Sequence, residues 1–256
     1  MPFDGIPIWA ILLGTIALGL AGLEMGVLLG RSRQRRRYEK LESAGGMVAV
    51  MMGLLAFMLA FTFTAAANRH DARRALVVDE ANAIETTWLR AGFLAEPYRA
   101  DIRRLLQDYV DVRVKAANGE IELGEALRQS EGLHERMWAV AVDAGRKDAG
   151  SITIGLVVQS LNEVIDLHLK RVTAALRDRI PVAIWLTLYL LIVIGAVMMG
   201  LEIGQGRTRH FPLELAVAVS FSIVLVMIVD LDRPFEGLVD VSQQATVDLQ
   251  TKLKNR

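Results

Sequence analysis

Residues 45–67 read GGMVAVMMGLLAFMLAFTFTAAA, a run without a single charged side chain. At a rise of about 1.5 Å per residue, a helix of this length can cross the roughly 30 Å hydrocarbon core of a bilayer. Three more apolar runs of spanning length are found at residues 6–29, 180–201 and 211–229. A soluble domain of this size does not carry so many such runs. The sequence therefore predicts an all-α integral membrane protein with four transmembrane helices.

The rest of the chain is organised around these runs. We expect a first transmembrane helix pair in residues 1–67, joined by a basic loop at 30–44, and a second pair in residues 180–230. Residues 68–179 are polar enough to form an extramembrane domain, and residues 231–256 form a C-terminal tail.

The extramembrane domain is predicted to be helical throughout. Residues 54–91 contain neither glycine nor proline, so the second transmembrane helix is expected to continue into this domain and to end at Gly92. Three further helices are expected. The first lies between Pro97 and Asn118, the second at residues 123–144 and the third at residues 151–179. No stretch alternates with the period of a strand, so no sheet is expected.

Apolar residues at helical spacing give these helices a side that can be buried. In the helix at 123–144 the expected apolar side consists of Leu127, Leu133, Met137, Trp138 and Val142. In the helix at 151–179 it consists of Val157, Leu161, Val164, Ile165, His168, Val172 and Leu176.

Positive charge after the first apolar run predicts the orientation of the chain. The basic residues of this short loop are Arg31, Arg33, Arg35, Arg36, Arg37 and Lys40. Loops rich in Lys and Arg stay in the cytoplasm. The N-terminus and residues 68–179 are therefore predicted to be extracytoplasmic.

Composition excludes several classes of function. The 256 residues include no cysteine, which removes thiolate catalysis and cysteine-ligated metals, and the formal net charge of zero gives no indication of a nucleic-acid partner. No phosphate-binding loop, nucleophile elbow or dinucleotide fingerprint occurs in a suitable context. We expect neither an enzyme nor a bound cofactor.

The first apolar run carries small residues at regular spacing. Gly22, Gly26 and Gly30 would lie on one face of a helix and allow another helix to approach closely, within one subunit or between two. Glu24 lies among them as an intramembrane acid. It should face protein or water, or extend toward the nearby membrane surface.

The second apolar run carries the candidate pore-lining residues, which are Gly53, Phe57, Phe61, Thr64 and Asn68. Phenylalanine rings one turn apart beside small and weakly polar residues could form a narrow hydrophobic constriction. The alternative is that the rings pack against neighbouring helices or lipid.

A group of charged residues is predicted at one membrane boundary. It consists of Arg69, Arg73, Asp230, Asp232 and Arg233. Such a group can form fixed ion pairs or the entrance to an ion pathway.

A metal site is a weaker hypothesis for the extramembrane domain. Asp79, Glu80 and Asn82 could bind a cation together with residues of the last soluble helix, namely Asn162, Glu163, Asp166 or His168. No ligand pair has a diagnostic spacing, so no metal is predicted, and His168 is expected to be a hydrogen-bonded core residue.

Four segments carry a family resemblance. GLLAFMLAFTF, DEANAIETTWLRA, LNEVIDLHLKRV and DLDRPFEGLVDVS occur in this order and together span nearly the whole chain. The sequence resembles the bestrophin-like membrane family of bacteria in these segments. The resemblance implies four spans, a helical middle domain and no established enzymatic chemistry. We expect the protein to lie in the bacterial inner membrane.

The resemblance also implies a function. True bestrophins are pentameric anion channels with a hydrophobic neck on the second transmembrane helix, and the pair Phe57 and Phe61 is similar in kind. Bestrophins, however, keep the region between the second and third spans in the cytoplasm, opposite to the orientation predicted from the basic loop. No dense acidic run of the bestrophin calcium-binding type follows the fourth span.

Two functional hypotheses follow. The first is a homo-oligomeric channel in the lipid bilayer, for anions by analogy, with about four or five subunits around a pore. The alternative is a membrane-anchored helical sensor or scaffold without transport activity.

Overall fold

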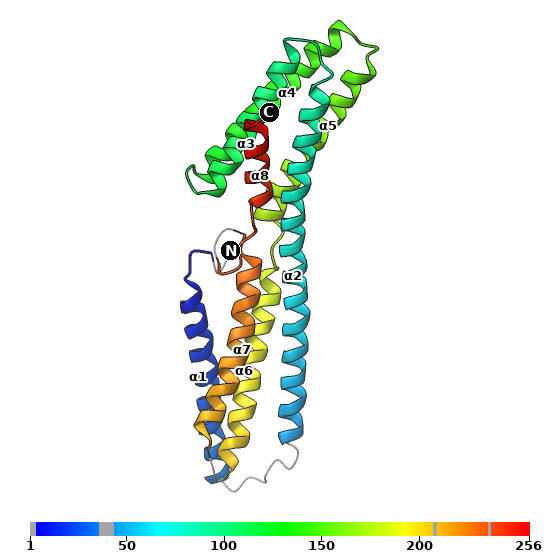
Figure 1. Ribbon diagram of the computed structural model, residues 1–256. Coiled ribbons are helices and arrows are strands. Elements are labelled where there is room, and N and C mark those ends of the chain that lie inside the picture. Colours follow the sequence, from blue (N-terminus) through cyan, green and yellow to red (C-terminus); the bar gives the residue numbers. More distant parts are fainter. Residues whose placement is uncertain (1–3, 36–43, 207–208, 235–236) are drawn as a thin grey trace. The chain divides into compact units, whose positions relative to one another are not determined.

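The computed structural model describes residues 4–35, 44–206, 209–234 and 237–256, which form eight helices and no strand (Figure 1). The helices are α1 (Ile8–Arg35), α2 (Ala44–Ala91), α3 (Tyr98–Ala117), α4 (Leu123–Lys147), α5 (Ile152–Leu176), α6 (Val182–Gln205), α7 (Phe211–Asp232) and α8 (Gln244–Lys254). The predicted all-α fold is confirmed. Arg36, Arg37 and Lys40 of the predicted basic loop lie outside the described residues.

The chain divides into two compact units. The first unit comprises Met1–His70 and Arg179–Asp240, and so contains α1, the first part of α2, α6 and α7. Within it, α1 packs against α6 and α7 (Figure 1). Buried apolar side chains from all four helices form its core, including Ile11, Leu55, Leu59, Trp185, Leu188 and Leu225. We call this unit the membrane unit.

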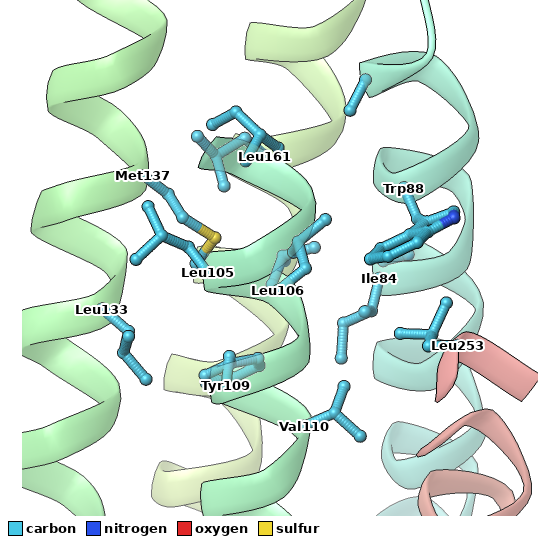
Figure 2. Close-up of a cluster of buried hydrophobic side chains, with 14 of the residues drawn as sticks. Ile84, Trp88, Leu105, Leu106, Tyr109, Val110, Leu133, Met137, Leu161 and Leu253 are labelled. Carbon is cyan, nitrogen blue, oxygen red and sulfur yellow. The ribbon is translucent and has the colours of Figure 1, made fainter. Parts of the chain in front are cut away.

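The second unit comprises Asp71–Asp178 and Val241–Arg256, and contains the rest of α2 with α3, α4, α5 and α8. Figure 2 shows side chains from these helices converging on one core, among them Ile84, Leu106, Tyr109, Met137, Leu161 and Leu253. We call it the helical unit.

Helix α2 runs without interruption from residue 44 to residue 91. Its continuation beyond the apolar run is confirmed, and its end at Ala91 agrees with the predicted stop at Gly92. The predicted helices between Pro97 and Asn118 and at 123–144 and 151–179 are also confirmed, with ends within a few residues.

The expected apolar side of α4 is partly wrong. Leu133 and Met137 are buried, but Trp138 is 39% and Val142 41% exposed. The buried side instead carries small and polar residues, namely Ala126, Ser130, His134, Ala141 and Ala144, together with Leu133 and Met137. These residues recur every three or four positions, so the periodicity of the helix, and not the size of the side chains, determines which face of α4 is buried.

Part of the predicted C-terminal tail folds into the helical unit as α8. Leu249 and Leu253 are buried there, and Gln107 on α3 donates a 3.1 Å hydrogen bond from Nε2 to the carbonyl oxygen of Leu253. Gln250 donates a 2.7 Å bond to Asp111 of α3. An ion pair between Lys252 and Glu85 connects α8 to α2.

By length and composition, five of the described helices could cross a membrane. They are α1, α2, α5, α6 and α7. The sequence predicted four, and α5 is the addition. Helix α5 belongs to the helical unit, where His168 and Arg171 place polar groups on its inner side.

Candidate functional site

One face of α2 in the membrane unit carries all five candidate pore-lining residues. Its packed face consists of Leu55, Leu59, Thr62 and Ala66, each at most 2% exposed. At roughly 100° of rotation per residue, Gly53, Phe57, Phe61, Thr64 and Asn68 lie about 180° away from that face. All five are exposed. The structure therefore brings the candidates together as one continuous stripe.

The stripe is apolar in the middle and polar at its C-terminal end. Phe57 is 66% and Phe61 65% exposed, so no other described part of the chain covers either ring. Thr64 satisfies its hydroxyl by donating a 2.9 Å hydrogen bond to the carbonyl oxygen of Ala60 in its own helix. The methyl group of Thr64 therefore contributes an apolar surface, and Asn68 presents the first strongly polar group.

Among the five candidate membrane helices, α2 is the least covered by its own chain. Only 17% of its most apolar window is buried, against 22% to 33% for the others. A helix with so much apolar surface must be covered by lipid or by another subunit.

The predicted glycines of α1 lie against α6. A Cβ atom built on Gly30 would lie 2.6 Å from the carbonyl oxygen of Leu201, and one on Gly22 would lie 3.2 Å from the Cβ of Ala196. A Cβ on Gly26 would overlap the carbonyl oxygen of Val197. Gly200 and Gly204 provide the matching small residues on α6, where a Cβ would meet the backbone of α1. The two backbones therefore touch directly, within one subunit.

Glu24 forms an ion pair with Arg209, at the start of the segment leading into α7. The side chain of Glu24 is 50% exposed. Arg209 also donates a 3.0 Å hydrogen bond from Nε to Glu214, whose side chain is only 3% exposed. The guanidinium of Arg209 thus binds two carboxylates, one on α1 and one on α7.

The predicted boundary charges at the end of α7 bind the backbone of the membrane unit. Asp230 accepts hydrogen bonds from the amides of Leu238 at 2.8 Å and Val239 at 3.0 Å. Asp232 accepts a 3.0 Å bond from the amide of Ile180. These carboxylates hold the chain segments on either side of the second helix pair.

The arginines of that predicted group act similarly. Arg233 donates a 2.8 Å bond from Nη2 to the carbonyl oxygen of Ile6. In the helical unit, Arg73 is 5% exposed and donates to the carbonyl oxygens of Ala174, near the end of α5, and of Asp178, just beyond it, both at 3.0 Å. For Arg69, Nη1 is buried without a hydrogen-bond partner among the described residues.

The residues weighed as metal ligands do not gather into a cation site. No group of three or more His, Asp or Glu residues suited to a metal occurs in the described part of the chain. Glu80 instead binds the hydroxyl of Tyr109 and the guanidinium of Arg171. His168 is 5% exposed and lies 3.0 Å from the Tyr109 oxygen, so the expectation of a hydrogen-bonded core histidine is confirmed.

Sequence reasoning missed the partners of these acids. Arg209 was not selected as the partner of Glu24, and neither Tyr109 nor Arg171 as a partner of Glu80. Each pair joins residues far apart in the chain, and no local spacing reveals such a contact. The only available signal was an ionisable group on an otherwise apolar helical face, which requires a partner.

Comparison with known proteins adds to these observations. Residues 15–246 match the sequence profile of a family described as "Bestrophin-like domain". The crystal structure of a bacterial bestrophin homologue from Klebsiella pneumoniae is similar with a TM-score of 0.68 at 14% identity, covering 97% of this chain and 98% of that chain. A variant of that homologue with one mutation gives a TM-score of 0.71 at 13% identity, covering 97% of each chain. No curated protein matches. At these identities the structural likeness is one of fold.

Proposed function

Because the chain belongs to the Bestrophin-like family, as its motifs predicted, we propose that this multi-pass membrane protein is a homo-oligomeric channel. Its four spans would be α1, the apolar part of α2, α6 and α7, with about four or five subunits around a pore. The observation that carries the proposal is the stripe on α2, where Gly53, Phe57, Phe61, Thr64 and Asn68 are all exposed on the side opposite the packed face.

The two phenylalanines would form the neck of the pore. Rings of Phe57 and Phe61 from several subunits would make a narrow apolar constriction, where an ion must shed water without receiving replacement ligands. Such a constriction limits conduction by dewetting. Asn68, about two turns beyond Phe61, would mark the wetter end of the neck. By analogy with the family, the permeant ion is an anion.

Planar-bilayer recording of purified protein tests the neck. The double variant Phe57→Ala/Phe61→Ala should conduct more than the wild type, since the neck becomes wider and wetter. The matched control is Leu186→Ala/Leu190→Ala on α6, which removes two exposed apolar side chains at the same spacing and should leave conductance unchanged. An active wild type whose conductance does not rise in the Phe variant would remove the neck from the proposal. The reversal potential in asymmetric salt identifies the ion.

The oligomeric state separates a channel from a membrane-anchored scaffold. The helical unit has its own core and could bind a partner without any transport. Native mass spectrometry in detergent should show a ring of about four or more subunits if the stripe on α2 lines a central pore. A monomer or dimer that is silent in bilayers would favour the scaffold.

We propose the orientation that the basic loop predicts, with the helical unit outside the cytoplasm. The chain has no cysteine, so single cysteines report cleanly. Glu120→Cys follows α3 in the helical unit and Ser32→Cys lies near the end of α1, and both positions are exposed. An impermeant maleimide added to intact cells should label Glu120→Cys only. Labelling of Ser32→Cys alone would establish the opposite orientation.

A further inference from the structure

The helical unit encloses a cluster of ionisable side chains contributed by four helices. Its members are Glu80 of α2, Tyr109 and Arg113 of α3, His134 of α4, and His168 and Arg171 of α5. Tyr109 lies in the apolar core of the unit (Figure 2). Glu80 is 1%, Tyr109 0%, His134 6% and His168 5% exposed. Water therefore stabilises these groups very little, and each depends on its neighbours.

The hydrogen bonds determine where the protons lie. Tyr109 has one hydroxyl proton and donates it to Oε1 of Glu80 at 2.6 Å. His168 Nδ1 lies 3.0 Å from the same Tyr109 oxygen. That nitrogen must therefore carry a proton and donate it to the hydroxyl oxygen. His168 is held as the Nδ1-protonated tautomer, and an additional proton would have to enter at Nε2.

The single carboxylate of the cluster is already shared by several donors. Glu80 binds Tyr109 and Arg171, and Arg113 Nε lies 3.6 Å from Oε2 of Glu80. Arg171 also donates a 2.8 Å bond to Gln243, in the segment that leads into α8. With neutral imidazoles the cluster contains one negative and two positive charges. No carboxylate of the cluster remains for a third cation.

The two imidazoles lie against each other and against the phenol. The centroids of His134 and His168 are 4.9 Å apart with the rings edge to face, and those of Tyr109 and His134 are 4.8 Å apart. His134 Nε2 is buried without a hydrogen-bond partner among the described residues. Five of the six other acidic residues within three positions of a cluster member are exposed, namely Asp79, Asp108, Glu131, Glu135 and Asp166; the sixth, Asp111, is partly exposed and contacts Gln250 and Lys254 of α8. A proton added at Nε2 of His134 would therefore meet no hydrogen-bond acceptor among the described residues.

We propose that this cluster is an acid-sensitive latch of the helical unit, closed while His134 and His168 are neutral and opened when they are protonated. Protonation adds positive charge to a buried cluster that is already net positive, next to Arg113 and Arg171. The contacts that it would break join α2, α3, α4 and α5, and through Gln243 the segment before α8. The latch belongs to the helical unit alone and does not depend on ion conduction.

The protonation equilibrium of His134 agrees with this geometry. Burial, and then the charge of Arg113, lower the pKa of His134 to about 4 despite the opposing effect of Glu80. In an unfolded or open chain the same imidazole titrates near pH 6.5. The open form therefore binds more protons than the closed form between these values, so the stability of the closed form falls as pH decreases through this window.

Hydrogen exchange of the full-length protein in detergent tests the latch. After correction for the intrinsic pH dependence of exchange, backbone protection in α3 and α4 should fall by about tenfold or more between pH 7.5 and pH 4.5. The double variant His134→Phe/His168→Asn keeps a ring at 134 and a donor near the Nδ1 position at 168. It should retain its protection at pH 4.5. The control His210→Asn changes an exposed histidine of the membrane unit and should respond like the wild type.

Two outcomes would overturn the latch. Wild-type protection that is equal at both pH values would show that the cluster does not open. An equal loss of protection in wild type and double variant would assign the response to carboxylates. If the double variant does not fold, histidine NMR of the wild type decides instead: the buried imidazoles must remain neutral at pH 6 and become protonated together with the loss of protection. An imidazole of the cluster that is charged at pH 6 within the folded unit contradicts the proposal.

Discussion

The hydroxyl of Tyr109 donates a 2.6 Å hydrogen bond to Oε1 of Glu80, and both side chains are almost completely buried. The bond joins α3 to the part of α2 that lies in the helical unit. Because its acceptor is a carboxylate excluded from water, it belongs to the stronger class of hydrogen bonds. It also aligns Glu80 to receive Arg171.

Replacing Tyr109 by Phe should therefore destabilise the helical unit by about 2 kcal/mol, because a buried carboxylate loses one of its donors. Denaturant unfolding of full-length protein, followed by circular dichroism, measures the change. The matched control is Tyr98→Phe, which removes a 2.6 Å bond to Asp143, an exposed acceptor. Water replaces the lost donor there, so the control should cost less. Equal losses of unfolding free energy in the two variants would contradict the claim that the buried bond of Tyr109 stabilises the protein more than the exposed bond of Tyr98.

The same phenol predicts a response to alkaline pH. Burial, and then the negative charge of Glu80, raise the pKa of Tyr109 well above its usual value near 10. The unfolded chain ionises this phenol first, so its contribution to stability is complete below about pH 10 and is lost as the pH rises further. The stability difference between wild type and Tyr109→Phe should shrink from pH 8 to pH 11. A difference that stays constant over this range would show that Tyr109 ionises normally in the folded protein.

Local sequence signals predicted most of the elements but few of the contacts between them. The charge-free run at 45–67 and the absence of glycine and proline from 54 to 91 were sufficient for α2, since both depend on residues close together in the chain. Helix α8 was missed because eleven residues with few apolar positions give a weak periodic signal. Its stability comes from burying Leu249 and Leu253 in the core of the helical unit.

In the candidate sites, too, local spacing predicted which residues share a helix face but not which residues of other helices contact them. The spacing of Gly53, Phe57 and Phe61 sufficed to place them on one face, because helical geometry fixes that relation. The partner of Glu80 could not be predicted in this way, because Tyr109 is on another helix and Arg171 on a third. Only packing brings them together. The burial of His134 on a face of small residues was hidden for the same reason.

The contact between α1 and α6 predicts a large effect of one methyl group. Gly26→Ala would place a Cβ against the carbonyl oxygen of Val197, which belongs to the backbone and cannot rotate away. The helices must separate, and we expect a loss of about 1–3 kcal/mol in stability. Thermal unfolding in detergent measures it. Gly14→Ala on the same helix has open space around the new methyl group and should be neutral or slightly stabilising. Equal behaviour of the two variants would refute direct backbone contact.

Arg209 should contribute to stability mainly through Glu214, because the side chain of Glu214 is 3% exposed whereas that of Glu24 is 50% exposed. Arg209→Gln removes the cation from a buried carboxylate and should lower the melting temperature clearly. Glu24→Gln removes only the exposed partner and should have a small effect, since exposed ion pairs contribute little. The double variant Arg209→Gln/Glu214→Gln removes the buried charge together with its partner and should recover much of the loss. The measurement is the melting temperature of the three variants and wild type in one detergent. If the double variant is less stable than Arg209→Gln alone, the cost comes from lost packing and not from an uncompensated carboxylate.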